Sequence, residues 1–160
     1  MLQPAAIDGL AFARSAGVIE GRLGMESLPR LAQSGCLGAT LDFVLSGEIN
    51  ERGKPGLRLG VHGHVRLVCQ RCLNEVEFPL RIEAELELGA SEAEILAADD
   101  DVERVVAGRD MSVAALVEEE VLLALPMVPK HEQCHAAAGT EGGAKPSAFQ
   151  ALAALKKLNR

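Results

Sequence analysis

Hydrophobic and polar residues alternate through most of the middle of the chain. The alternation occupies three runs, at residues 39–49, 56–69 and 75–88. A repeat of two places every second side chain on the same face, so each run predicts a β-strand with one buried face. The links at 51–56 and 70–74 are short and polar, which is typical of hairpins. The pattern predicts an antiparallel meander, with Pro79 at a sheet edge or a bulge.

The remaining segments predict helices around this sheet. A short helix is expected near 7–15, an extended segment at 18–23 and a helical segment at 25–33, with Pro29 in its first turn or at its end. Residues 102–108 could add a strand. The clearest helix spans 112–126, where Ser112 can cap the first turn and the apolar last turn predicts deep burial. Its expected core-facing stripe is Val113, Leu116, Val117, Val121 and Ala124, with Glu118, Glu119 and Glu120 on a solvated face and Glu120 as the one able to turn toward a partner.

These elements predict an α+β fold, an antiparallel and partly open barrel-like sheet packed by a helix. Residues 1–134 are expected to form one domain, since 160 residues suffice for one core. Residues 135–147 are rich in Gly and Ala and are expected to be a flexible linker. Residues 148–160 contain a short amphipathic helix, which needs to dock on the domain or on a partner to be stable.

The composition narrows the function classes. The chain has no Trp, no Tyr and four Phe, so an aromatic platform for stacking RNA bases is not expected. There is no run of 18 apolar residues and no pattern of a secretory signal, so neither a membrane span nor secretion is expected. Four cysteines are too few for a disulfide scaffold, and a reduced, cytoplasmic location is predicted.

Charge is distributed unevenly along the chain. The net charge is −7, but residues 50–82 carry +3 and residues 83–120 carry −11. The overall acidity argues against a non-specific coat on nucleic acid, which needs many Lys and Arg residues. The basic middle could still contact RNA locally, and the acidic block would favour a basic protein partner. A plainly solvated surface is the alternative for both regions.

Two short-spaced pairs of metal-type ligands stand far apart in the sequence. Cys69 and Cys72 form a Cys-x-x-Cys, and His131 and Cys134 form a His-x-x-Cys with the same spacing. Such pairs are typical of closed, structural zinc sites, in which a tetrahedral Cys3His set leaves no open position. His135 could replace His131. A tight turn without metal, with Cys69 as a core thiol, and a redox pair remain alternatives, although redox motifs usually open a helix.

Cations follow the polar face of the predicted strands. Arg58, Arg66 and Arg81 lie on or near that face and Arg71 at the turn, where they could grip phosphates or simply be solvated. His62 and His64 could reach a phosphate or a metal, but solvent exposure is the simpler expectation. The predicted RNA- or partner-binding residues are Arg58, Arg66, Gln70, Arg71, Arg81 and Lys156. No phosphate loop, nucleophile motif or convergent carboxylates point to an enzyme, although a hidden nuclease is an alternative.

Two motifs give the chain a resemblance to a known family. With Cys-Gln-Arg-Cys at 69–72 and Glu-Glu-Val-Leu-Leu-Ala-Leu-Pro-Met-Val-Pro-Lys-His at 119–131, it resembles the YceD family, described as large ribosomal RNA subunit accumulation proteins. The tail departs from the family's Asn-Pro-Phe, because Pro146 and Phe149 are separated here. The resemblance implies a non-enzymatic cytosolic factor for accumulation of 23S ribosomal RNA. Its expected partners are pre-ribosomal RNA or a basic ribosomal or processing protein, with no small-molecule substrate. A zinc-stabilised protein-interaction module without RNA contact is the second hypothesis.

Overall fold

The computed structural model describes residues 6–98 and 100–135. Its strands are β1 (Ala6–Ile7), β2 (Val18–Gly24), β3 (Gly38–Ile49), β4 (Pro55–Val68), β5 (Glu75–Gly89), β6 (Arg104–Val106) and β7 (Met111–Ser112). Its helices are α1 (Gly9–Arg14), α2 (Pro29–Gln33), α3 (Glu92–Ala97) and α4 (Val113–Ala124), and a 3₁₀ turn covers Met25–Ser27. The predicted linker from residue 136 onward and the predicted C-terminal helix lie outside the described residues.

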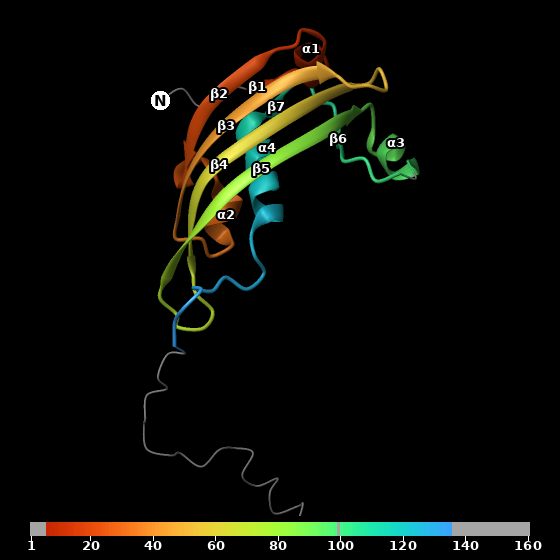
Figure 1. The fold of residues 1–160 in the computed structure, drawn as a ribbon. Helices are drawn as coiled ribbons and strands as arrows, with labels where there is room; N and C mark the ends of the chain where they lie inside the picture. Colours follow the sequence, from red (N-terminus) through yellow and green to blue (C-terminus); the bar gives the residue numbers. More distant parts are fainter. Residues whose placement is uncertain (1–5, 99, 136–160) are drawn as a thin grey trace, which may run out of the picture.

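The predicted α+β fold is confirmed. Five strands form one sheet in the order β2-β3-β4-β5-β6, which is antiparallel except for the parallel pairing of β5 with β6 (Figure 1). Two hairpins join β3 to β4 and β4 to β5, as the polar links predicted. The sheet is curved but, within the described residues, it does not close into a barrel. A separate two-stranded pair joins β1 to β7.

Pro79 lies where its missing N–H does least harm. β6 pairs only with Glu87–Gly89, so the part of β5 that contains Pro79 forms an edge of the described sheet. Proline cannot donate a hydrogen bond to a neighbouring strand, and it is tolerated on an edge strand because such a strand has a neighbour on one side only. The predicted edge position is confirmed.

One face of the sheet is buried beneath the helices. α4 crosses behind the long strands in Figure 1. The hydrophobic residues that alternation assigned to the inner face of β3 and β4 are all buried, namely Leu41, Phe43, Leu45, Leu57, Leu59, Val61, Val65, Leu67 and Cys69. Val113, Val117 and Val121 of α4 are fully buried against this layer. No helix in the described part of the chain is long and apolar enough to span a bilayer.

The predicted burial of the last turn of α4 is wrong. Leu123 is 71% exposed, Ala124 is exposed, and Met127 beyond the helix is 99% exposed. The buried stripe runs along Val113, Val117 and Val121 at steps of four residues, which places Leu123 on another side of the helix. Ala124 shares the side of the stripe, but it is the last residue of the helix and lies beyond the buried part. An apolar sequence therefore ends on an open surface.

The predicted solvated face of acidic residues on α4 is also wrong in part. Glu119 is exposed, but Glu118 and Glu120 are buried. The carboxylate of Glu118 accepts a hydrogen bond from the backbone N–H of Leu31, at 2.9 Å, in the first turn of α2. That N–H has no partner within α2 itself, so Glu118 caps a helix from a different element.

Candidate metal centre and outer sheet face

The two predicted ligand pairs meet at one end of the sheet. Cys69 and Cys72 lie in the turn between β4 and β5, while His131 and Cys134 lie in the segment that follows α4. Figure 1 shows this segment returning to the tip of the β4–β5 hairpin. The ligand atoms of all four residues lie within 4.8 Å of one another. The structure thus brings together a Cys3His set that can hold a metal ion.

Backbone hydrogen bonds shape the turn and join it to the second segment. The N–H of Cys69 donates to the carbonyl of Asn74, and the N–H of Leu73 donates to the carbonyl of Cys69, both at 2.9 Å. Leu73 adopts a positive φ of 63°, which lets the chain reverse sharply. The N–H of Gln70 donates to the carbonyl of Pro129 at 2.8 Å. This last hydrogen bond joins the turn that carries Cys69 and Cys72 to the segment that carries His131 and Cys134.

The spacing of the ligand atoms matches a tetrahedral ion. The sulfurs of Cys69 and Cys134 are 3.7 Å apart, and the sulfur of Cys72 is 3.3 Å from Nδ1 of His131. Zinc–sulfur bonds of about 2.3 Å and zinc–nitrogen bonds of about 2.0–2.1 Å imply tetrahedral edges of roughly 3.8 Å and 3.6 Å. Both separations lie close to these edges, so the residues fit a four-coordinate ion with no large rearrangement.

The second nitrogen of His131 is engaged in the way a metal ligand requires. Nε2 lies 2.9 Å from the carbonyl oxygen of Glu75, so Nε2–H donates and Nδ1 keeps its lone pair for the cluster. Such an outer hydrogen bond fixes the tautomer and orientation of a ligating histidine. His131, not the alternative His135, is the histidine of the cluster.

Donors around the sulfurs favour thiolates. Arg71 donates from Nε to the sulfur of Cys134 at 3.1 Å and from a second nitrogen to the carbonyl of His131 at 2.8 Å. Burial opposes ionisation of Cys69, but backbone N–H groups of Cys72, His131 and Arg71 outweigh it and lower the pKa of Cys69 to about 5. The backbone N–H of Asn74 favours the thiolate of Cys72, but burial and the neighbouring sulfurs of Cys69 and Cys134 outweigh it and raise the pKa of Cys72. A bound cation would relieve the repulsion between neighbouring thiolates.

The fourth cysteine of the chain takes no part in this cluster. Cys36 is buried near the start of β3, with its sulfur 3.5 Å from the hydroxyl of Ser34. Cys36 is therefore an isolated thiol among the described residues. This makes it a natural internal control for the other three cysteines.

The predicted RNA- or partner-binding arginines are mostly engaged with other groups. Arg58 forms ion pairs with Glu48 at 3.3 Å and Glu85 at 2.9 Å, and Arg66 pairs with Glu75 at 3.3 Å. Arg71 is drawn into the cysteine cluster. Among the described residues, Arg81 forms no ion pair.

Two further predicted binding residues have different settings. Gln70 is exposed on the turn, and its side-chain amide donates to the carbonyl of Val68 at 3.1 Å. Lys156 lies outside the described residues. A binding role for any of these side chains stays a prediction.

A cross-strand row on the outer face was missed from the sequence. Register places Arg22, Asp42, His62 and Arg81 side by side on β2, β3, β4 and β5. Arg22 binds Asp42 at 2.7 Å, and Nε2 of His62 lies 3.9 Å from the same carboxylate. His62 and His64 are both solvent-exposed, as the simpler expectation had it. The acidic neighbour of His62 comes from an adjacent strand, where sequence proximity gives no sign of it.

A cluster of charged side chains lies at the end of the sheet away from the cysteines, and it was not predicted from the sequence. Glu87 is buried and accepts hydrogen bonds from Arg104 at 3.1 Å and Asn50 at 2.9 Å, while Arg104 also binds Asp100. Burial opposes ionisation of Glu87, but these donors and Arg52 hold its pKa below the ordinary range. Arg104 holds the pKa of Asp100 well below its usual value. These contacts fasten β6 and the β3–β4 turn to β5.

Comparison with known proteins gives a match over the part of the chain that contains the cysteine cluster. A family model described as "Large ribosomal RNA subunit accumulation protein YceD" matches residues 57–159, which include most of β4, all of β5 and all four ligands. No curated protein and no solved structure matches the chain. The family description supports a role in ribosome biogenesis. Since the match covers well over half of the sequence, the chain belongs to the YceD family.

Proposed function

We propose that the protein is a non-enzymatic ribosome biogenesis factor that supports synthesis, processing or accumulation of the 23S ribosomal RNA. The observation that carries this proposal is the family match over residues 57–159. It acts in the cytoplasm, where large-subunit precursors are assembled. Its partners are pre-ribosomal RNA or a basic ribosomal or processing protein, the latter favoured by the net charge of −11 on residues 83–120.

The cluster at the end of the sheet is proposed to hold structural zinc. Three thiols and one imidazole are the ligands that zinc prefers in closed sites, and the four ligands leave no position for a substrate. Zinc would fasten the hairpin tip to the segment after α4 and so fix the surface around Gln70 and Leu73. The ion shapes a binding surface and supplies no catalysis in this proposal.

Sedimentation at low salt tests the function directly. The intact protein, in an extract of cells that express it, is expected to co-sediment with precursors of the large subunit. Because the contact is partly electrostatic, the bound fraction should fall as salt is raised. A protein that stays at the top of the gradient at every salt concentration would contradict the direct-binding proposal.

One observation favours the second candidate, an interaction module without RNA contact. Arg58 and Arg66 have carboxylate partners on neighbouring strands, so these two cations are not free to follow a phosphate backbone. Ultraviolet crosslinking in living cells separates the two candidates. Crosslinked RNA fragments from the large-subunit precursor support direct contact, whereas crosslinks to protein alone support the interaction module.

A further inference from the structure

Gly60 lies in the middle of β4 at a position where the fold does not require glycine. It belongs to the outer, solvent-facing side of the sheet, between Val44 of β3 and Glu83 of β5. Its φ lies outside the left-handed region. A Cβ at this position would meet only the end of the flexible Glu83 side chain, at 3.4 Å. Glycine weakens a strand interior, so its presence here calls for another reason.

Most of the other glycines of the described sheet strands have such reasons within the fold. At Gly63 the φ is +153° and a Cβ would lie 2.1 Å from the carbonyl oxygen of Thr40. At Gly47 a Cβ would lie 2.3 Å from the backbone of α1, and at Gly21 it would press on the ring of Phe43. Gly56 and Gly89 likewise have a neighbouring atom within 3.1 Å of the added carbon, whereas at Gly24 and Gly38 the nearest atoms are the flexible side-chain ends of Glu26 and Arg66. Among the glycines of the described sheet strands, Gly60 has the widest free space, with no atom closer than 3.4 Å to an added Cβ.

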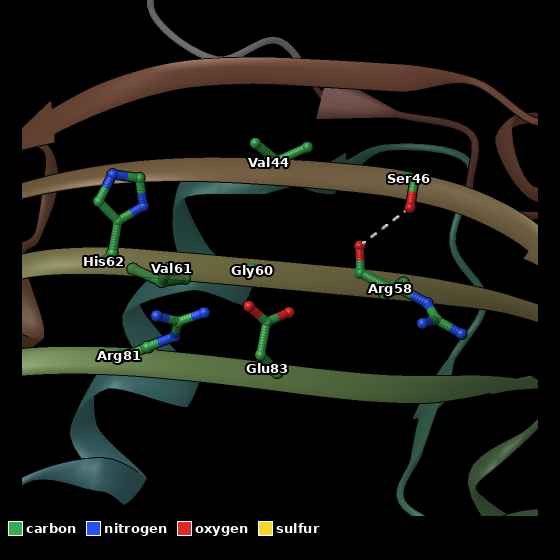
Figure 2. Close-up of a pocket in the computed structure, with 8 residues that line it drawn as sticks. All are labelled: Val44, Ser46, Arg58, Gly60, Val61, His62, Arg81 and Glu83. Carbon is green, nitrogen blue, oxygen red and sulfur yellow. Dashed lines mark hydrogen bonds between the residues drawn. The ribbon is translucent and has the colours of Figure 1, made fainter.

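That space is a hollow of about 460 Å³ on the outer face. One side is the row that contains His62 and Arg81, and the other is the row that joins Ser46, Arg58 and Glu85. These rows lie four residues apart along β4, or about 13 Å at 3.3–3.4 Å per residue. Figure 2 shows Arg81 and Glu83 side by side on β5, with their charged ends turned toward Gly60. Val44 adds an apolar wall that is 43% exposed.

Two of the charged groups at the hollow, Arg81 and Glu83, have no ion-pair partner among the described residues. Neither Arg81 nor Glu83 forms an ion pair there, in contrast to Arg58 and Arg66. A ligand that fits must offer acceptors to the guanidinium and donors to the carboxylate. It must also be flat, since the floor is bare backbone and the hollow is shallow and open.

We propose that the hollow over Gly60 binds one unpaired guanine base of RNA. This inference rests on the proposed function, which supplies the RNA. Guanine presents O6 and N7 as acceptors, which arginine binds in a bidentate manner, and N1–H and N2–H as parallel donors that a carboxylate accepts. Uracil and adenine lack the paired donors. Unstacked bases in single-stranded regions expose both edges, and such bases are the usual targets of sequence-specific RNA recognition.

This proposal accounts for the outer face better than phosphate binding does. Glu83 at the rim would repel a phosphate, and Arg58 is already neutralised by Glu48 and Glu85. A base is neutral, so the carboxylate is a partner for it. The absence of an aromatic platform limits the site to a single base held by its edges over the strand backbone.

The test uses the intact protein labelled with ¹⁵N and titrated with guanosine monophosphate. Uridine monophosphate, inorganic phosphate and tetralysine serve as comparison ligands. We expect the nucleotide with guanine to shift the amide signals of Gly60 and Val44 and leave that of Gly35, a remote turn residue, unchanged. Binding of uridine monophosphate should be at least fivefold weaker, and phosphate alone should leave Gly60 unmoved.

Two variants and a control complete the test. Gly60→Val fills the hollow with a residue that suits a strand, and it should weaken binding at least tenfold without lowering the melting temperature. Glu83→Gln removes the bidentate acceptor and should also weaken it at least tenfold. Thr40→Val adds the same side chain elsewhere on the exposed face of β3 and should change nothing.

Several results would overturn the proposal. Equal binding of both nucleotides, or a shift of the Gly60 signal that phosphate alone reproduces, would contradict recognition of guanine. A Gly60 shift produced by tetralysine and not by the nucleotide would assign the hollow to a basic protein side chain, and no shift at all would leave it without a ligand. If guanine binds but the protein fails to sediment with large-subunit precursors, the proposed function fails and the base site stands.

Discussion

The proposed zinc ion in the Cys3His cluster predicts a large and selective effect of chelation on stability. An ion shared by Cys72 and His131 links positions that are 59 residues apart in the sequence. By the loop-entropy relation for a cross-link of that length, the constraint on the unfolded chain contributes about 4 kcal/mol. Mass action gives a similar figure, about 2.7–4.1 kcal/mol for free zinc at roughly 100 to 1,000 times its Kd. Both free energies are upper values, because hydrogen bonds such as that from Gln70 to Pro129 can still join the two segments when no metal is bound.

The assay is thermal unfolding followed by circular dichroism, with and without a strong zinc chelator. At about 2–4 °C per kcal/mol, the chelator should lower the Tm of the wild type by at most about 8–16 °C. Cys134→Ser should show the lower Tm at the outset and respond little to chelator. Cys36→Ser, whose sulfur lies outside the cluster, should keep the full response. A wild-type Tm that ignores the chelator, with no zinc found by elemental analysis, would refute the metal site.

Two further predictions concern other parts of the fold. Glu118→Ala should lower the free energy of unfolding by about 1–3 kcal/mol, because the buried N–H of Leu31 loses its acceptor, and urea titration measures this; a change near zero would contradict the capping role. Arg104→Met should destabilise the protein more at pH 7 than at pH 3. The pKa values of Glu87 and Asp100 are lowered in the folded state, so their stabilisation is present above their ordinary pKa of about 4 and is lost as pH falls through the folded values. Unfolding curves of Arg104→Met and wild type across that range check the sign, and a difference that grows at low pH would refute it.

Alternation predicted the sheet because a repeat of two is an unambiguous signal of one buried face. Every inward residue predicted on β3 and β4 is buried, and the turn at Cys69–Cys72 lies where its polar link indicated. The same hairpin also fixes which residues face one another. The pairing of Arg58 with Glu85 could therefore have been anticipated from the turn position, although the sequence alone suggested a row of free cations.

Other features depend on how distant segments pack, and sequence patterns do not encode that. The meeting of Cys69 with Cys134 requires the segment after α4 to return to the hairpin tip, which no spacing rule fixes. The burial of Glu118 depends on α2 lying beside α4, and the exposure of Leu123 depends on which face of α4 meets the sheet. Hydrophobicity indicates that a residue can be buried, and packing decides whether it is.

In the proposed function, this family member supports 23S ribosomal RNA through a binding surface that a metal ion holds in place. The most direct measurement is the ratio of 23S to 16S ribosomal RNA in cells that lack the protein and are supplied with wild type, Cys134→Ser or Cys36→Ser at equal protein levels. We expect a low ratio without the protein, restored by wild type and by Cys36→Ser but not by Cys134→Ser. An unchanged ratio in cells without the protein, or full restoration by Cys134→Ser, would contradict the proposed function.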